Sequence, residues 1–237
     1  MPDTEAGLGY GSVFEMADLA TPTVFTYIAE AYNFTPPSET TDTPDATHFQ
    51  SPNRTREFIE GLTDPGEASF EMNLVPGSAS DKALIAAKGK RKWCRFTFPN
   101  GVQVMFTGLR QGYEKSVPND DKMTATVTWK VSGDPIQTDP TAPRNLVAAA
   151  IAGTAQVGAP LTVDPGVWAG ALDLAIKWQK DNAGDGNFAD IAGATGTAYV
   201  PVADDVGDEI RVSITGSNDD FSTTANSAAT AAVIAAA

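Results

Sequence analysis

The feature that most constrains the fold is an alternation of apolar and polar residues that recurs in several separate segments. In residues 124–131, Ala, Val, Trp and Val alternate with Thr, Thr, Thr and Lys. Successive side chains of a β-strand point to opposite faces, so this pattern predicts a strand with one buried face. Similar patterns predict strands at 70–74, 94–98, 102–106 and 24–34. We therefore expect the N-terminal part of the chain to consist mainly of β-sheet.

Three connecting segments interrupt the predicted strands. Asn100-Gly101 lies between two of them, and this dipeptide is a strong signal for a β-hairpin. The segment Ser80–Gly89 begins with a Ser cap and an early Asp and ends with a Lys and a Gly, which predicts a short helix. Residues 36–52 are rich in Pro, Thr, Asp and Ser and predict a long loop, which in a compact domain is usually functional or disordered.

A polar connector divides the chain into two predicted domains. Residues 132–145 contain three prolines and two aspartates, so we expect a stiff, extended segment with a domain boundary near Pro143. The predicted domains are 1–143 and 144–237. In the second domain, apolar pairs and turn signals recur at intervals of about eight to twelve residues, which is typical of a small antiparallel sandwich. The predicted fold class is all-β with one short helix.

Charge and cysteine content narrow the classes of function. The chain has 30 acidic and 16 basic residues, a net charge of −14, which argues against tight non-specific binding of DNA but not against DNA moving past it. The single cysteine, Cys94, excludes an intramolecular disulfide and suits a reducing cytosol. The N-terminus lacks a signal-peptide pattern, and the apolar stretches are too short to span a bilayer. We therefore expect synthesis in the cytosol and no membrane partner.

Enzyme chemistry has little support, and we predict no catalytic, cofactor-binding or metal-binding residues. The only histidine, His48, falls in the predicted loop, and Cys94 falls in a core strand pattern. Gly7–Gly11 lacks the third glycine and the preceding strand of a dinucleotide site, which favours a terminal arm. Asp181–Asn187 lacks the ligand spacing of a calcium loop and is interpreted as a polar turn. The basic run Lys88–Arg95 is interpreted as a subunit contact rather than a nucleic-acid site.

One stretch of the first domain resembles a known family. Residues 54–67, RTREFIEGLTDPGE, are similar to a segment of the major tail tube proteins of long-tailed bacteriophages. The predicted helix, the 96–106 hairpin and the strand ending at 131–135 follow in the order of that family, so the resemblance covers most of 10–136. The resemblance implies two packed β-sheets with a flanking helix, in a β-sandwich or barrel.

That resemblance also implies a function in the virion. Subunits of the family form hexameric rings, and the rings stack into the tube through which DNA leaves without sequence-specific binding. The implied partners are other copies of the chain and the tape-measure, tail-terminator and tail-tip proteins, in a tail made in the host bacterial cytoplasm. The N-terminal arm and the loop at 35–53 would then become ordered when rings stack. The polar strip of Thr124, Thr126 and Thr128 is either an ordinary solvated face or the lining of a channel.

The second domain resembles bacterial and phage immunoglobulin-like domains over about 153–234. The resemblance rests on 158–168, 176–181, 191–196 and 203–212. It implies an outward-facing β-sandwich, for which we consider weak adhesion to bacterial surface glycans. Such a domain would crowd a contractile sheath, so a non-contractile tail of the siphophage type is preferred to a contractile system. A cell-surface adhesin or carbohydrate-binding module with tandem β domains stays open as the alternative.

Overall fold

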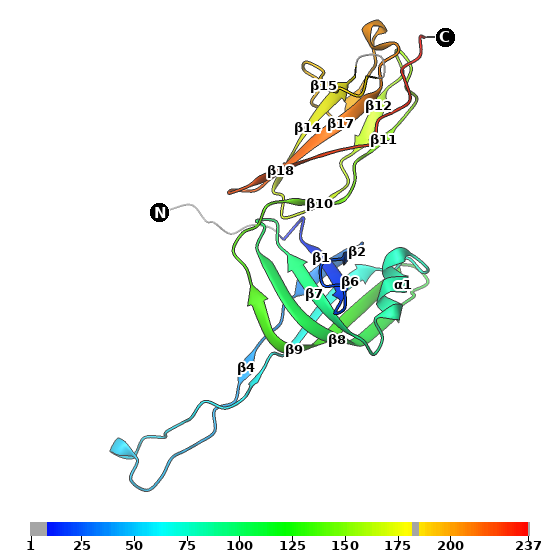
Figure 1. The fold of residues 1–237 in the computed structure, drawn as a ribbon. Coiled ribbons are helices and arrows are strands. Elements are labelled where there is room, and N and C mark those ends of the chain that lie inside the picture. Colours follow the sequence, from blue (N-terminus) through cyan, green and yellow to red (C-terminus); the bar gives the residue numbers. More distant parts are fainter. Residues whose placement is uncertain (1–8, 182–184, 237) are drawn as a thin grey trace. The chain divides into compact units, whose positions relative to one another are not determined.

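The computed structural model describes residues 9–181 and 185–236, and these form two compact units (Figure 1). The N-terminal unit comprises residues 13–96 and 103–137. The C-terminal unit comprises residues 9–12, 97–102, 138–181 and 185–236. Both units consist mainly of β-strands and the N-terminal unit carries the one α-helix of the described residues, so the predicted all-β fold class is confirmed.

The N-terminal unit is built on one seven-stranded sheet. Its strands follow the spatial order β2-β1-β7-β8-β9-β6-β3. The strands predicted from the alternation patterns at 70–74, 94–98, 102–106 and 124–131 are present, and their apolar faces are buried. The seven strands are β1 (Val13–Asp18), β2 (Phe25–Ile28), β3 (Ala31–Thr35), β6 (Glu67–Asn73), β7 (Arg91–Thr97), β8 (Gln103–Ser116) and β9 (Thr124–Gln137).

The sheet curls over an aromatic core. Phe14 of β1 and Phe70 of β6 are separated by three strands in the sheet order, yet their ring centroids are 4.5 Å apart. Phe34 and Phe96 also come from strands that are distant in the sheet, and their centroids are 5.1 Å apart. Trp129 is fully buried beside them. Because these rings can meet only across a folded sheet, the core lies inside its concave face.

The long strand predicted at 24–34 is wrong. The chain forms two strands there, and β2 pairs with β1 whereas β3 pairs with β6 at the other end of the sheet. Glu30 breaks the strand with a φ of 65°, and its carbonyl oxygen accepts a hydrogen bond of 3.0 Å from the Asn73 amide. The two halves keep similar alternation, so the pattern alone gives no sign of the turn between them.

The predicted helix is present as α1 (Ala79–Ala86), but its cap differs from the prediction. Ser78, not Ser80, is the N-cap, and its hydroxyl accepts the Asp81 amide at 3.1 Å. Ser80 lies inside the helix, where its buried hydroxyl accepts the Ala29 amide at 2.9 Å. The helix ends before Lys88, and Gly89 follows with a φ of 68°. The helix therefore starts earlier than predicted, with Ser78 as its cap and Ser80 in a tertiary contact.

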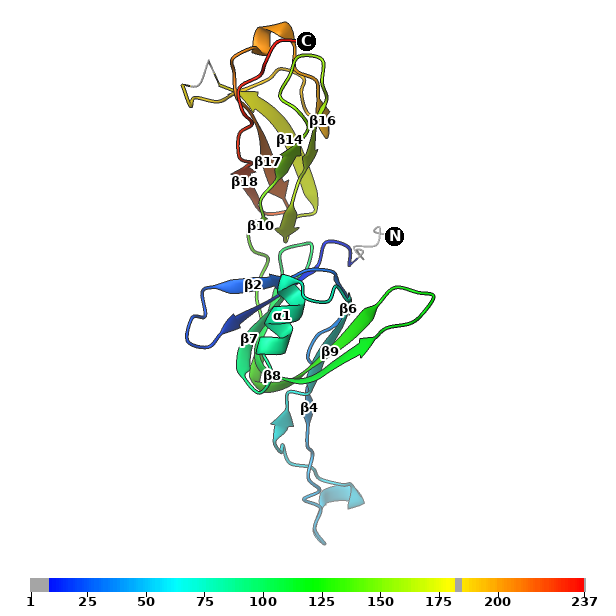
Figure 2. The same ribbon diagram turned by 90° about the vertical axis from the view of Figure 1, so that its right-hand side faces the viewer.

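The predicted loop at 36–52 is one side of a two-stranded arm. Residues 38–66 leave the sheet between β3 and β6 and return to it, as Figure 1 and Figure 2 both show. At the base of the arm β4 (Thr40–Thr41) pairs with β5 (Thr63–Asp64), and the turn η1 (Pro52–Arg54) lies near its tip. The segment is thus neither a compact loop nor part of the core.

The C-terminal unit contains small antiparallel sheets around a second core. A two-stranded sheet pairs β10 (Arg144–Val147) with β13 (Val167–Ala169). The three-stranded sheet has the order β11 (Ala150–Ala152), β12 (Leu161–Asp164), β16 (Ala198–Tyr199). The four-stranded sheet has the order β15 (Ala189–Asp190), β14 (Asp173–Lys180), β17 (Ile210–Ser217), β18 (Ser222–Asn226). The inward positions expected on β12, β14 and β17 pack in this core, whereas Val200, also expected inside, is exposed.

Buried polar bonds supplement the apolar core of the C-terminal unit. The indole N–H of Trp178 donates to the Gly196 carbonyl at 2.9 Å. Asp205, at the end of the short helix η2 (Ala203–Asp205), is buried and accepts the Tyr199 hydroxyl at 2.6 Å and the Lys180 ammonium at 2.7 Å. Burial favours the protonated acid, but these bonds outweigh it and lower the pKa of Asp205. The sheets are therefore held by this network as well as by Trp178.

Candidate assembly surfaces

The arm has a regular backbone but no buried residue. Its two sides are joined by hydrogen bonds such as that from the Ala46 amide to the Glu57 carbonyl, at 2.8 Å, and no residue from 38 to 66 is buried. Large apolar side chains are exposed along it. These are Phe49, Phe58, Ile59 and Leu62. A two-stranded hairpin is only marginally stable in water, and exposed apolar side chains favour association, so the arm has the character of a contact surface.

Two glycines allow the sides of the arm to approach each other at its base. Gly66 has a φ of 75°, and a Cβ there would lie 2.1 Å from the Ser38 carbonyl oxygen. A Cβ on Gly61 would lie 2.7 Å from the Asp42 carbonyl oxygen. The Asp64 carboxylate accepts the Gly66 amide at 2.8 Å, which closes the turn into β6. The motif Gly-Leu-Thr-Asp-Pro-Gly at 61–66 therefore forms the return side of the arm.

Along β6, β9 and β8, the outward face of the sheet is polar and mostly uncharged or acidic. Thr126 is exposed on β9, with Glu71 of β6 opposite on one side and Glu114 of β8 opposite on the other. Directly opposite residues of antiparallel strands share a face, so the three side chains form one row. The neighbouring Lys130 lies opposite Glu67 and forms an ion pair with Asp64 at 3.0 Å. The face therefore offers no unpaired lysine along β9.

The sheet also ends in two open edges. Strands β2 and β3 are the terminal members of the seven-stranded order, and neither has a second neighbour in the described part of the chain. Exposed edge strands carry unpaired N–H and C=O groups that can pair with another strand. Both edges are therefore available for pairing with further copies.

Two of the five basic residues in the run 88–95 pair with carboxylates of the same chain, and the interpretation of the run as a subunit contact stays a prediction. Lys92 forms an ion pair with Asp18 on β1. Arg95 donates to both carboxylate oxygens of Glu15 at 3.0 and 3.1 Å, and both side chains are almost fully buried. These acidic partners belong to the same chain. A basic run beside alternating apolar residues gives no indication of whether its partner lies in the same subunit or another.

The other residues considered for chemistry are not assembled into a site. His48 lies in the arm, where its Nε2 is 3.5 Å from the Glu57 carboxylate. Burial raises the pKa of the Cys94 thiol well above its usual value, so it stays protonated in the core. Gly7 and Leu8 lie outside the described residues, so the predicted terminal arm is not described there. The turn at 181–187 is described only in part, with both Asp181 carboxylate oxygens accepting backbone amides.

Within residues 9–181 and 185–236, no three His, Cys, Asp or Glu side chains are grouped so that they could hold a metal ion. No helix in the same part of the chain is both long and apolar enough to cross a membrane.

Comparison with known proteins decides the family. The family model described as lambda phage tail tube protein matches residues 10–138, which is more than half of the chain and takes in the sheet, the helix and the arm. The chain belongs to this family. It is therefore a structural protein of the tail of a phage-like particle and not an enzyme, as expected from the sequence. No curated protein sequence matches the chain.

Several solved structures resemble this family member at low sequence identity. A subunit from the tail of an empty gene transfer agent particle, refined with C6 symmetry, is 17% identical, with a TM-score of 0.48 over 56% of this chain and 100% of that chain. The SPP1 tail tube is 12% identical, with a TM-score of 0.44 over 55% and 77%. A chain of the anti-feeding prophage baseplate is 9% identical, with a TM-score of 0.45 over 57% and 97%.

Sequence reasoning missed the arm as a structural element of this tail tube protein. It treated 36–52 as a loop and 54–67 as a family segment, whereas the structure pairs the two. Neither side alternates cleanly, because neither side faces a core. The signal that could have found the arm is the glycine spacing at 61 and 66, where close backbone approach is required.

Proposed function

We propose that the chain forms hexameric rings that stack into the tube of a non-contractile, siphophage-type tail, and that DNA leaves through this tube. The observation that carries the proposal is the preformed arm, whose backbone is ordered although none of its residues is buried. An arm with a regular backbone and exposed apolar side chains favours a partner surface, and stacking supplies one from another copy. The two open sheet edges support ring closure, because pairing between neighbours removes them.

The composition of the outward face of β6, β9 and β8 supports the proposal that this face lines the channel. Its row of Glu71, Thr126 and Glu114 places carboxylates and a hydroxyl where phosphates would pass. Cationic groups would release counterions from DNA and retain it, whereas this face offers hydroxyls and carboxylates. DNA can then move through the tube without being held.

The proposed division into domains is 1–143 for the tube domain and 144–237 for an immunoglobulin-like domain. The sheet composition of the C-terminal unit and its core around Trp178 support a sandwich of this type. We place this domain on the outside of the tail, as an accessory that adheres weakly to bacterial surface glycans. The tape-measure, tail-terminator and tail-tip proteins are the proposed partners inside and at the ends of the tube.

Electron microscopy of the purified full-length protein tests the tube. We expect rings and stacked tubes to appear as the protein is concentrated, because mass action favours edge pairing and arm contacts. Sedimentation of the same samples should show the corresponding loss of monomer. Protein that stays monomeric at every concentration, and that is absent from purified particles, would contradict the proposal.

A phage whose tail tube gene lacks the codons for residues 144–237 tests whether the C-terminal domain is an accessory. We expect particles with normal tubes and unchanged tail length, since the family match ends at residue 138. Adsorption to host cells should decrease modestly if the domain contributes glycan adhesion. Loss of tubes in the truncated phage, with the truncated protein still folded and soluble, would show that the domain takes part in assembly.

A further inference from the structure

Within the described residues, the arm carries a cation without an ion pair at its tip and carboxylates without ion pairs at its base. The tip carries Arg54 and Arg56, and the flanking carboxylates of Asp45 and Glu57 are engaged by Arg56 and by Ser51 and His48. At the base lie Glu39 and, on β9 close by, Asp134. This separation of charge along one element favours contact between the tip of one copy and the base of another.

Arg54 is the cation available at the tip. Its side chain forms no ion pair within the described residues, and the residue is exposed. Arg56, by comparison, lies 3.9 Å from Asp45 of the same arm. Asn53 and Arg54 both have left-handed backbone conformations, with φ of 55° and 59°, at the point where the chain reverses. Phe49, fully exposed on the same tip, adds an apolar side chain beside the cation.

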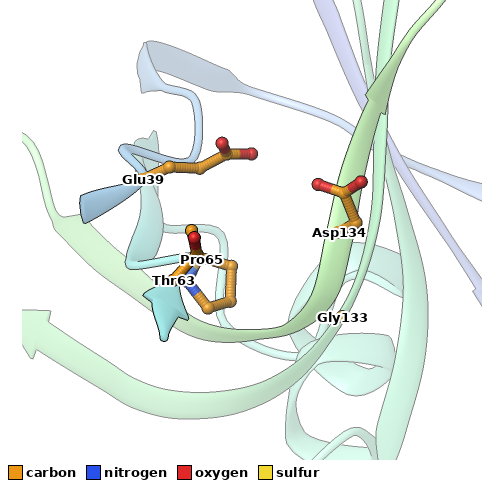
Figure 3. A pocket seen from close by; sticks show the side chains of 5 residues that line it. All are labelled: Glu39, Thr63, Pro65, Gly133 and Asp134. Atoms are coloured by element: carbon orange, nitrogen blue, oxygen red, sulfur yellow. The ribbon is translucent and has the colours of Figure 1, made fainter. Parts of the chain in front are cut away.

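A cavity lies at the base of the arm. It has a volume of about 440 Å³ and is lined by Glu39, Thr63, Pro65, Gly133 and Asp134. Figure 3 shows the Glu39 and Asp134 carboxylates on opposite sides of the space, pointing toward it. Neither carboxylate forms an ion pair within the part of the chain that is described, and the lining contains no cation. A guanidinium can bind two carboxylates at once because its five N–H donors lie in one plane.

We propose that Arg54 at the arm tip of one copy docks between Glu39 and Asp134 at the arm base of a second copy. This inference rests on the proposed stacking of rings. It identifies the arm base of a second copy as the surface that receives the arm tip. An arm cannot fill its own base, because about a dozen extended residues on each side span roughly 35–40 Å. The cross-arm hydrogen bonds, such as Asp42 N–H to the Leu62 carbonyl at 3.0 Å, keep it extended.

A tip-to-base contact also explains how a tube can grow by adding copies along its axis. The two surfaces are different, so when the tip of one copy docks at the base of a second, the base of the first copy and the tip of the second stay free. Such a heterologous contact continues along an axis when the operation that relates successive copies does not close into a ring, as stacking requires. The Arg54 contact therefore permits indefinite stacking, with the tube length set by other proteins.

Charge reversal in the full-length protein tests the contact, with the critical concentration for tube formation as the measurement. We expect Arg54→Glu, and separately Glu39→Lys with Asp134→Lys, to raise this concentration at least about tenfold, because each places like charges together. Combining all three substitutions restores opposite charge and should return it to within about threefold of the parent. Lys82→Glu on α1 and Asp120→Lys in the turn after β8 are matched controls that should change little. Circular dichroism checks that every variant is folded.

Each outcome bears on the proposal. If the parent protein forms tubes and the charge-reversed variants assemble equally well, the Arg54 contact is overturned. The proposed tube function still stands in that case. Loss of assembly in both reversals without recovery in the combined protein also overturns the contact. A parent protein that forms no tubes at any concentration overturns the proposed function itself, and the contact with it.

Discussion

Replacement of residues 42–62 by a two-residue Asn-Gly turn is expected to abolish tube formation and leave a folded, soluble subunit. The pairing of β4 with β5 remains to close the shortened hairpin, including the 2.9 Å hydrogen bond between the Thr41 and Thr63 hydroxyls. No removed residue is buried, so the aromatic core loses no packing. Electron microscopy gives the assembly result, and the thermal unfolding midpoint should change by no more than about a few degrees.

The matched control shortens the exposed turn at 117–122 between β8 and β9. That segment also contains no buried residue, and its removal should leave tubes intact. Normal tubes from the arm replacement would mean that the arm is dispensable and that stacking uses another surface. A subunit that fails to fold would instead show that the arm stabilises the sheet, contrary to its lack of burial.

The second prediction with a large expected effect concerns the stability of the fold. The buried carboxylate of Asp81 joins α1 to β8 by hydrogen bonds. Asp81 accepts the Lys115 ammonium at 2.6 Å and the Tyr113 hydroxyl at 2.8 Å on one oxygen, and the Gly77 amide at 2.8 Å on the other. The hydrogen bond from Lys115 is the largest cause that lowers the pKa of Asp81 to about 2. Asp81→Asn is expected to lower the free energy of unfolding by about 2 kcal/mol near neutral pH.

The effect of Asp81→Asn should depend on pH in a defined direction. A carboxyl whose pKa is lower in the folded state contributes stability above its unfolded value, and loses it as pH falls through the folded value. For Asp81 the contribution is complete above about pH 4 and disappears toward about pH 2. The difference between parent and variant should therefore shrink over that range.

Urea denaturation followed by circular dichroism at several pH values measures this difference. Asp120→Asn, in the exposed turn after β8, is the control and should match the parent at every pH. An Asp81→Asn variant as stable as the parent near neutral pH would show that the three bonds do not stabilise the fold. A difference that persists unchanged at about pH 2 would show that charge is not its source.

The sequence by itself determined the elements whose signals are local. Alternation with a period of two identified strands β6, β7, β8 and β9, because a strand with one face in the core must alternate. The Asn-Gly pair located the β7–β8 turn, although of the two only Gly101 adopts a positive φ, of 85°. The single histidine and single cysteine correctly indicated a protein without catalytic chemistry, and the 54–67 segment indicated its family.

Only the tertiary structure decided the features that depend on residues distant in the chain. Strands β2 and β3 separate because the Glu30 carbonyl is held by Asn73, more than forty residues away. Arg95 is an internal partner because Glu15 comes to lie beside it on β1. The arm pairs two segments that face no core, and therefore carry no periodicity, so its sequence shows no pattern of burial. Local patterns record which face of an element is buried, whereas pairing between distant elements depends on the order in which the strands assemble into the sheet.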